Sequence, residues 1–246
     1  MKIVFSRKGF DSASGGAPSP IIKGRPVSIP IPATHRSQTT YGHLGLGAVV
    51  REITRNCFTE NSLCHCDPMF QGHKCAFGQT SAAQSHLTNN NVGVGDVFLF
   101  FGLFSGIDGK HRHHRIFGFL QVERVLHLGA NPKLEDQPPG FEIQHPHTIG
   151  VWSPNNTIYL GPGKTAKKSH SELSLSVPGN QVSKWKIPHW LKNTGLTYHG
   201  RRDRWGDDYT LQVVPRGQEF ITDITGNYDA YGWLEKILSI IFRDQS

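Results

Sequence analysis

Two strongly apolar segments joined by a short Gly- and His-rich connection constrain the fold more than any other feature of this sequence. Residues 97–104 and 116–126 each have the length and the aromatic and branched side chains of a β-strand. The connection between them has the glycines and polar residues of a hairpin loop. The sequence therefore predicts a hairpin of two long apolar strands.

Shorter patterns predict a protein rich in strands with few helices. Further strands are expected at 3–5, 27–31, 158–160, 173–177 and 209–214. Helices are expected at 46–53 and at 81–87, where Ser81 and Gln84 fit a capping box. A C-terminal amphipathic helix is expected from the spacing of Leu234, Ile237, Leu238 and Ile241, all of which we expect to face the core. With 27 glycines and 15 prolines adding turns, the fold class is α+β and β-rich.

The charge balance favours a polyanionic partner. The formal net charge is +7, and Lys and Arg release counterions when they neutralise phosphates. The opening Met1–Lys8 has too short an apolar run for a signal peptide, and no segment has the apolar length of a membrane span. We therefore expect a cytoplasmic protein whose four cysteines are reduced and form no disulfide.

The segment Ser6–Asp11 carries a basic pair and a carboxylate directly after a buried strand. Gly15 and Gly16 follow, and glycines allow backbone N–H groups to approach an anion closely. Arg7 and Lys8 are thus candidates to hold a phosphate, and Asp11 is a candidate acid or base. The alternative is a salt-bridged turn without a ligand.

All four cysteines lie in 56–77, which we expect to be irregular. Zinc held by Cys64, Cys66 and Cys75 is the minority interpretation, because the chain has no Cys-x-x-Cys pair. We therefore assign no metal ligands. The competing interpretation makes His65 and Asp67 an acid/base pair, and a loop with free thiols is the third.

Two basic segments are expected at the surface. Gly161–Thr165 resembles part of a phosphate loop but lacks its first glycine, so we expect a basic surface loop and no nucleotide hydrolysis. Lys110–Arg115 places six successive donors at the hairpin tip, where they suit phosphate contacts; a metal-binding His tract and a solvated turn are the alternatives.

Two later segments mix groups that suit a nucleobase. Tyr198–Trp205 combines basic and aromatic side chains, and Arg216–Glu219 offers an amide and a carboxylate that suit a base edge. An ordinary surface is the alternative for both. The chain has neither a Gly-x-Ser-x-Gly elbow nor a Gly-x-Gly-x-x-Gly segment after a strand, so we name no cofactor.

The opening motif, with Gly15-Gly16 and Pro18-Ser19-Pro20, resembles the start of a bacterial and phage family, the third type of nucleotide-modification-associated domain. The other similar stretches are His65 with Asp67-Pro68, Phe77–Gln79 with Ala82–Gln84 and His86-Leu87, Gly95–Gly102, Tyr198–Gly200 and Arg216–Phe220. Because the resemblance spans nearly the whole chain, it implies one domain over 1–246. The family is associated with DNA base hypermodification, which implies a role in making or handling modified bases without defining a reaction.

A second, local resemblance concerns the hairpin within about 92–127. Val94–Phe101 and Ile116–Val122 look like the core hairpin of PUA-like folds, including the EVE and ASCH groups, in which a small barrel holds a base or an RNA element. The expected architecture is therefore a small PUA-like barrel or a strongly bent mixed sheet, with the C-terminal helix packed on it.

Motifs and resemblance together predict a polar pocket for a nucleotide or a base flipped from DNA. We expect five of the motif residues to share this pocket: Arg7, Lys8, Asp11, His65 and Asp67. Catalytic candidates are Lys8, Asp11, His65 and Asp67. Substrate-binding candidates are Arg7, Gly15, Gly16, Gln79, Gln84, His86, His199, Arg216 and Glu219.

The leading hypothesis is a DNA base hypermodification protein, with DNA or a nucleotide as partner, alongside other enzymes of a base-modification pathway. The alternatives are a non-catalytic reader of modified bases and a nuclease directed at modified or foreign DNA. Divalent cations held by clustered carboxylates would favour the nuclease, and few such clusters are evident in the sequence.

Overall fold

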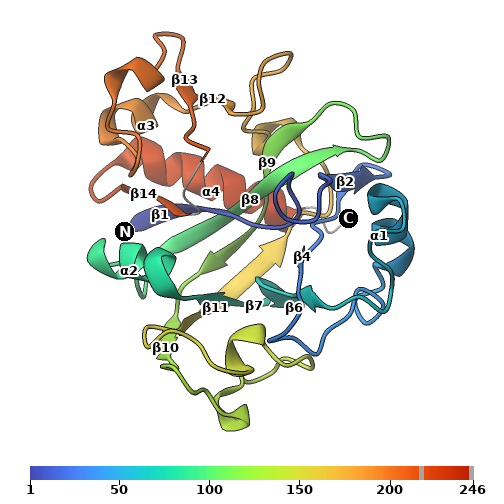
Figure 1. Ribbon diagram of the computed structural model, residues 1–246. Coiled ribbons are helices and arrows are strands. Elements are labelled where there is room, and N and C mark those ends of the chain that lie inside the picture. The colour runs from blue at the N-terminus through green and yellow to red at the C-terminus, as the bar shows by residue number, and fades with distance from the viewer. Residues whose placement is uncertain (216–218, 244–246) are drawn as a thin grey trace.

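The predicted apolar hairpin lies at the centre of the fold (Figure 1), a computed structural model that describes residues 1–215 and 219–243. Its strands β8 (Val97–Gly106) and β9 (His113–Gln121) pair antiparallel. Successive side chains of a strand point to opposite faces, and here both faces are covered. Leu99 and Phe101 belong to one buried apolar cluster, whereas Phe98 and Phe100 belong to another. Two cores therefore enclose the hairpin.

The hairpin belongs to a ten-stranded mixed sheet. The strand order is β14 (Glu219–Asp223), β1 (Lys2–Arg7), β8, β9, β11 (Thr157–Thr165), β7 (Lys74–Gln79), β6 (Met69–Gln71). In addition, β10 (Arg124–His127) pairs with β11, β2 (Ser19–Ile22) pairs with β8, and β3 (Arg25–Pro26) pairs with β2. The strands described form no closed barrel, so the mixed sheet is confirmed and the PUA-like resemblance is not.

Both β1 and β2 lie parallel to β8 on the same edge of that strand. The chain leaves the edge after Arg7, where the Lys8 N–H donates to the Phe101 carbonyl, and returns at Ser19. Residues 9–18 thus form a loop that projects from the edge. Gly15 has φ +97°, and a Cβ there would overlap the Phe10 ring, so this turn requires glycine.

Helices and two small sheets surround the main sheet (Figure 1). The α-helices are α1 (Gly47–Thr54), α2 (Ser81–Asn89), α3 (His189–Thr194) and α4 (Tyr228–Arg243). The small sheets pair β4 (Ile31–Pro32) with β5 (Cys64–His65), and β12 (Lys184–Lys186) with β13 (Thr210–Gln212). Short 3-10 turns are η1 (Leu134–Asp136), η2 (Pro146–Thr148), η3 (Ser171–Leu173) and η4 (Arg202–Arg204). Within the described residues, no helix combines the length and apolarity needed to cross a membrane.

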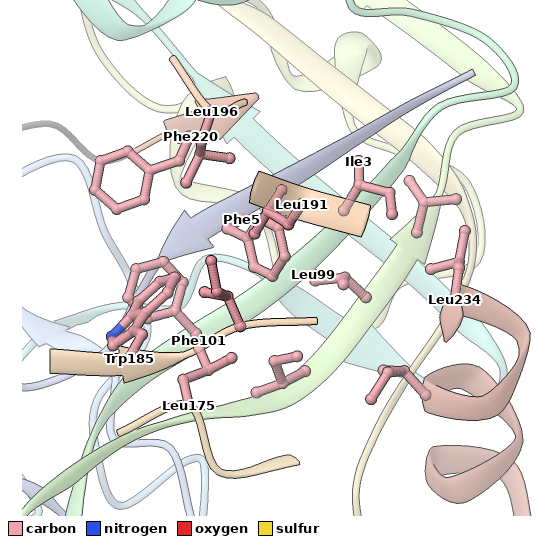
Figure 2. Packing of buried hydrophobic residues seen from close by; sticks show 14 of the residues in the cluster. Ile3, Phe5, Leu99, Phe101, Leu175, Trp185, Leu191, Leu196, Phe220 and Leu234 are labelled. Carbon is pink, nitrogen blue, oxygen red and sulfur yellow. The ribbon is translucent and has the colours of Figure 1, made fainter. Parts of the chain in front are cut away.

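The C-terminal helix α4 packs on the sheet as predicted, and Figure 2 shows part of the cluster it completes. Leu234, Ile237 and Ile241 are buried, and they pack in one cluster with Phe5 and Phe101 of β1 and β8. Leu238 is only partly buried, so its prediction as a buried residue was wrong. It lies one helical residue beyond Ile237, at the margin of the apolar face.

Several expected elements differ from the observed ones because pairing overrides local pattern. The alternation at 27–31 predicts a strand, but within it only Ile31, in β4, belongs to a strand, and β2 at Ser19–Ile22 was not predicted. The 116–126 strand divides into β9 and β10, and 173–177 holds η3 and isolated bridges. Strands β7 and β14 had no predicted counterpart, since 56–77 was expected to be irregular and 219–223 was assigned no strand.

The predicted capping box at α2 was also wrong. The N-cap is Thr80, and its side chain makes no capping hydrogen bond. The Ser81 Oγ lies 2.6 Å from Ser153 Oγ, and the Gln84 amide donates to Tyr159 OH at 3.1 Å. These tertiary partners hold both side chains away from the local cap.

The two basic segments are not surface loops throughout. Gly161–Thr165 continues β11, and the Lys164 side chain is buried because β11 pairs with β7 and β9. At the hairpin tip, β9 begins at His113, so His114 and Arg115 are buried within the strand. Lys110–His113 therefore keep exposed or partly exposed side chains, whereas His114 and Arg115 do not offer phosphate contacts of the expected kind.

Candidate active site

One cavity of about 200 Å³ collects the motif residues that are far apart in the sequence. It lies where β1 ends, and residues of β5, of β7 and of the loop that contains η2 line it. Its walls are formed by Arg7, Lys8, Gly9, Asp11, Ser14, Ile31, His65, Asp67, Gly78, Gln79, Thr80, His147 and Trp152. Arg7, Lys8, Asp11, His65 and Asp67 thus share one cavity, as expected, whereas their chemical roles stay predictions.

The two cations at the end of β1 are already occupied by protein partners. Lys8 Nζ lies 3.1 Å from Glu219 Oε1 and 4.5 Å from the centre of the Phe77 ring. The Arg7 guanidinium donates to the carbonyls of Pro215 and Val214, and burial lowers the pKa of Arg7. Each cation thus has a protein partner, although Arg7 Nε has none, so these side chains are less available to a phosphate than an unpaired Arg or Lys.

Asp11 shapes the loop that follows β1. Its Oδ1 accepts hydrogen bonds from the Ala13 and Ser14 N–H groups, at 2.8 and 2.7 Å. Gly15 and Gly16 both have positive φ but lie outside the wall of this cavity. They line another cavity with Arg55. The glycines therefore set the path of the loop and do not meet the motif residues in one pocket.

Asp67 is the buried centre of the site. Its Oδ1 accepts a hydrogen bond of 3.0 Å from the Gly78 N–H of β7. His145 Nε2, fully buried, lies 3.4 Å from the same oxygen but without hydrogen-bond geometry. Both neighbours are on the Oδ1 side, so Oδ2 is the oxygen left for other partners.

Two imidazoles face that second oxygen. His65 Nε2 and His147 Nε2 each lie 3.7 Å from Asp67 Oδ2, and donor atoms of all three residues lie within 4.8 Å of one another. A separation of 3.7 Å exceeds hydrogen-bond length. The predicted His65–Asp67 pair is therefore adjacent but not bonded.

Asn156 and Trp152 fix the orientation of the His147 ring. Its Nδ1 lies 2.6 Å from Asn156 Oδ1, while Asn156 Nδ2 donates to the His147 carbonyl at 2.9 Å. Trp152 stacks on the imidazole, with ring centres 4.2 Å apart, and the Arg36 guanidinium lies 4.5 Å from the centre of the indole. The ring is consequently fixed with Nε2 toward Asp67.

The environment favours the deprotonated form of both Asp67 and His147. Burial acts to raise the pKa of Asp67, but His145, His65 and His147 together outweigh it and hold that pKa below its ordinary value. Burial lowers the pKa of His147 to about 3, although Asp67 acts in the opposite direction. At neutral pH the cluster thus contains a carboxylate facing a neutral imidazole.

The cysteines are all free thiols. Cys64 and Cys75 are buried and Cys66 is partly buried. Burial raises the pKa of Cys64 and of Cys66 to about 12 in each case. Among the described residues these thiols do not gather with other donors into a group that could hold a metal ion, so they suit packing better than the minority zinc interpretation.

The remaining substrate-binding candidates divide between the cavity and the core. Gln79 lines the cavity, and its amide donates to Glu219 Oε1 at 2.6 Å. Gln84 is bonded to Tyr159, and His199 is buried with both ring nitrogens bonded to backbone groups. These two side chains stabilise packing and lie outside the cavity wall.

His86 lies on α2 against Thr197 and Tyr198, also outside the cavity wall. Glu219 is not part of the cavity wall, but its Oε1 lies 3.1 Å from Nζ of the wall residue Lys8. Arg216, predicted to bind substrate, lies outside the described residues.

Sequence reasoning missed His145, His147 and Trp152. The available signal was His145-Pro146-His147, two imidazoles separated by one proline in a stretch to which no element and no role was assigned. Nothing local connects this segment with Asp67, nearly eighty residues earlier.

The fold and the Asp67–histidine cluster define a mixed-sheet protein with a small, polar, partly buried cavity. The sequence profile of nucleotide modification associated domain 3 matches residues 2–223, and the chain belongs to this family. The suspected family is thereby confirmed, and with it an association with nucleotide modification. No curated protein and no solved structure matches the chain.

Proposed function

We propose that this chain acts on the base of a nucleotide, either free or flipped out of DNA, which enters the cavity beside Asp67. The observation that carries the proposal is the meeting of the Asp67–histidine cluster with the stacked Trp152 in one cavity of a nucleotide-modification family member. A base needs both a flat apolar surface and polar groups at its edge.

The size of the cavity supports a single base. Its volume of about 200 Å³ is below the roughly 300–1,000 Å³ typical of sites for larger ligands, and equals about seven water molecules in the liquid. One heteroaromatic ring with its substituents fits such a volume, whereas a whole nucleotide does not. Sugar and phosphate would therefore lie outside the mouth.

Charge distribution supports the same arrangement. Arg7 and Lys8 are engaged by protein partners, so a phosphate gains little from them. Arg36 packs over the Trp152 ring that lines the cavity and is only partly buried. We assign the phosphate outside the cavity to Arg36, consistent with the net charge of +7.

The reactive side of the base would face Asp67 and His65. Lys8, Asp11 and Gln79 complete the polar wall around it. Because Asp67 Oδ2 and His65 Nε2 are 3.7 Å apart, a group bound between them can contact both. Proton transfer to or from such a group is the predicted role of the pair.

Binding of deoxynucleoside monophosphates by isothermal titration calorimetry tests the proposal. Trp152→Leu should weaken binding about fivefold or more, because the indole lines the cavity, stacks on His147 and carries Arg36 over its ring. Tyr209→Leu, which removes an exposed aromatic outside the cavity wall, is the matched control and should bind like wild type. Equal affinity for all three proteins would contradict the proposal.

Mass spectrometry of nucleosides tests the chemistry. DNA from cells that produce the wild-type chain should contain a nucleoside that is missing when Asp67→Asn replaces it. Base binding without any such change would support the reader alternative, and strand cleavage would support the nuclease.

A further inference from the structure

We propose that His65, Asp67 and His147 bind one divalent transition-metal ion at the inner end of the cavity. The sequence alone assigned no metal here. The inference deepens the proposed function, on which its relevance to nucleotides rests: with the ion bound, Asp67 and His65 would hold a base or water through the ion in place of direct contacts. The binding of the ion depends only on the three side chains. The inference starts from the direction of the donor atoms.

Hydrogen bonding determines which nitrogen of His147 is free. Asn156 Nδ2 donates to the His147 carbonyl, so its Oδ1 is the atom 2.6 Å from His147 Nδ1. Nδ1 must therefore carry the proton in this contact. Nε2 is the ring nitrogen that this contact leaves free, and it lies 3.7 Å from Asp67 Oδ2.

Within the described residues, no hydrogen bond reaches Asp67 Oδ2 or His147 Nε2, although their side chains are only 5% and 3% exposed. Lys8 lies against Glu219, and the Arg7 guanidinium donates to backbone carbonyls. A carboxylate with so little exposure is costly without a positive partner, and a cation among the three donors supplies one.

The neighbours of the donors match the usual support of a metal site. Metal-binding histidines typically donate their other N–H to a carbonyl or carboxylate, as His147 does to Asn156. The carboxylate ligand is commonly hydrogen-bonded too, and Asp67 Oδ1 accepts from Gly78 N–H with His145 nearby. Oδ2 is thereby left for the ion.

The geometry requires only a small contraction. Ligands at about 2.1 Å from one ion are roughly 3–3.4 Å apart, compared with 3.7 Å for each contact to Asp67 Oδ2 and at most 4.8 Å overall. His65 is the most exposed of the three, with a fifth of its side chain accessible, and it is the ligand best able to move inward.

The donor set defines the class of ion. Two imidazoles and one carboxylate suit iron(II), manganese(II), cobalt(II) or zinc(II), whereas magnesium and calcium prefer oxygen ligands only. Three protein ligands leave coordination positions open toward the cavity, where water or a base can bind.

Cobalt(II) added to chelator-treated protein tests the inference. Equilibrium dialysis with elemental analysis should give one cobalt per chain, with visible absorption bands that report nitrogen and oxygen ligands. His147→Asn deletes Nε2 but keeps an amide nitrogen on Cγ for the bond to Asn156, and it should weaken binding at least tenfold. His65→Ala, at the accessible position, should do the same.

Two control variants make the result specific. His127→Asn alters an exposed histidine outside the cluster, and Cys66→Ser removes the central thiol of the cysteine alternative. Both should bind cobalt like wild type, and cobalt should raise the thermal unfolding midpoint of wild type but not of His65→Ala.

Absence of stoichiometric cobalt in wild type would overturn the inference, as would binding that Cys66→Ser abolishes and His65→Ala preserves. Nucleotide binding is measured separately on the chelator-treated protein. The proposed function and the metal site can therefore fail independently of each other.

Discussion

The pairing of Lys8 with Glu219 behind the cavity wall can be tested by a double-mutant cycle. Glu219 is 1% exposed and Lys8 11%, and the two residues are 211 positions apart in the sequence. Glu219→Gln keeps the Oε1 acceptor for Lys8 and for Gln79 and removes the charge. Lys8→Met removes the partner and keeps the length of the side chain.

The magnitude follows from burial and distance. Charges 3.1 Å apart interact by about 5 kcal/mol at an effective dielectric constant of 20, and residual exposure of Lys8 reduces this value. Breaking a buried pair costs about 3–5 kcal/mol, because the remaining charge is left uncompensated. We expect each single variant to lose about 3 kcal/mol of unfolding free energy.

Urea unfolding monitored by circular dichroism measures all four proteins. The Lys8→Met/Glu219→Gln double variant should be about as stable as either single variant, which gives a coupling energy of about 2–3 kcal/mol. Losses below 1 kcal/mol for Glu219→Gln, or losses that simply add in the double variant, would refute the buried-pair argument. In that case Lys8 would be free to bind a phosphate.

Three further outcomes are expected. Burial lowers the pKa of His114 to about 3, so an unfolded chain takes up a proton that the fold excludes as the pH falls below about 6.5. Stability should therefore fall with decreasing pH, by about 2 kcal/mol between pH 6.5 and pH 5 from this residue, and the dependence should be shallower in His114→Asn when urea unfolding is repeated across this range. Leu234→Ala should cost about 2–5 kcal/mol in the same unfolding assay, and a loss under 1 kcal/mol would show that α4 is not part of the core. Gly78→Ala places a Cβ on the His147 ring and should weaken cobalt binding at least tenfold by dialysis, while Gly93→Ala, in open space, should not.

Local patterns in the sequence predicted the parts of the fold that depend on local properties. The strands of the hairpin β8–β9 are long, nearly continuous apolar runs, and the helix α4 has a periodic apolar face. Both elements are present in the structure. The strands β7 and β14 were not predicted, because each is short and acquires its partners from distant segments. Lys164 illustrates the same limit: a loop-like sequence becomes a buried strand once neighbours bond to it on both sides.

For the site, the groups on offer could be read from the residue types: Arg7, Lys8 and Asp11 follow a strand, and His65 stands two residues before Asp67. The pairing of Lys8 with Glu219, and the place of His147 and Trp152 beside Asp67 in one cavity, could not be read in this way. Burial and long-range contacts set charge, protonation and orientation, and they depend on segments that meet only after the sheet has formed.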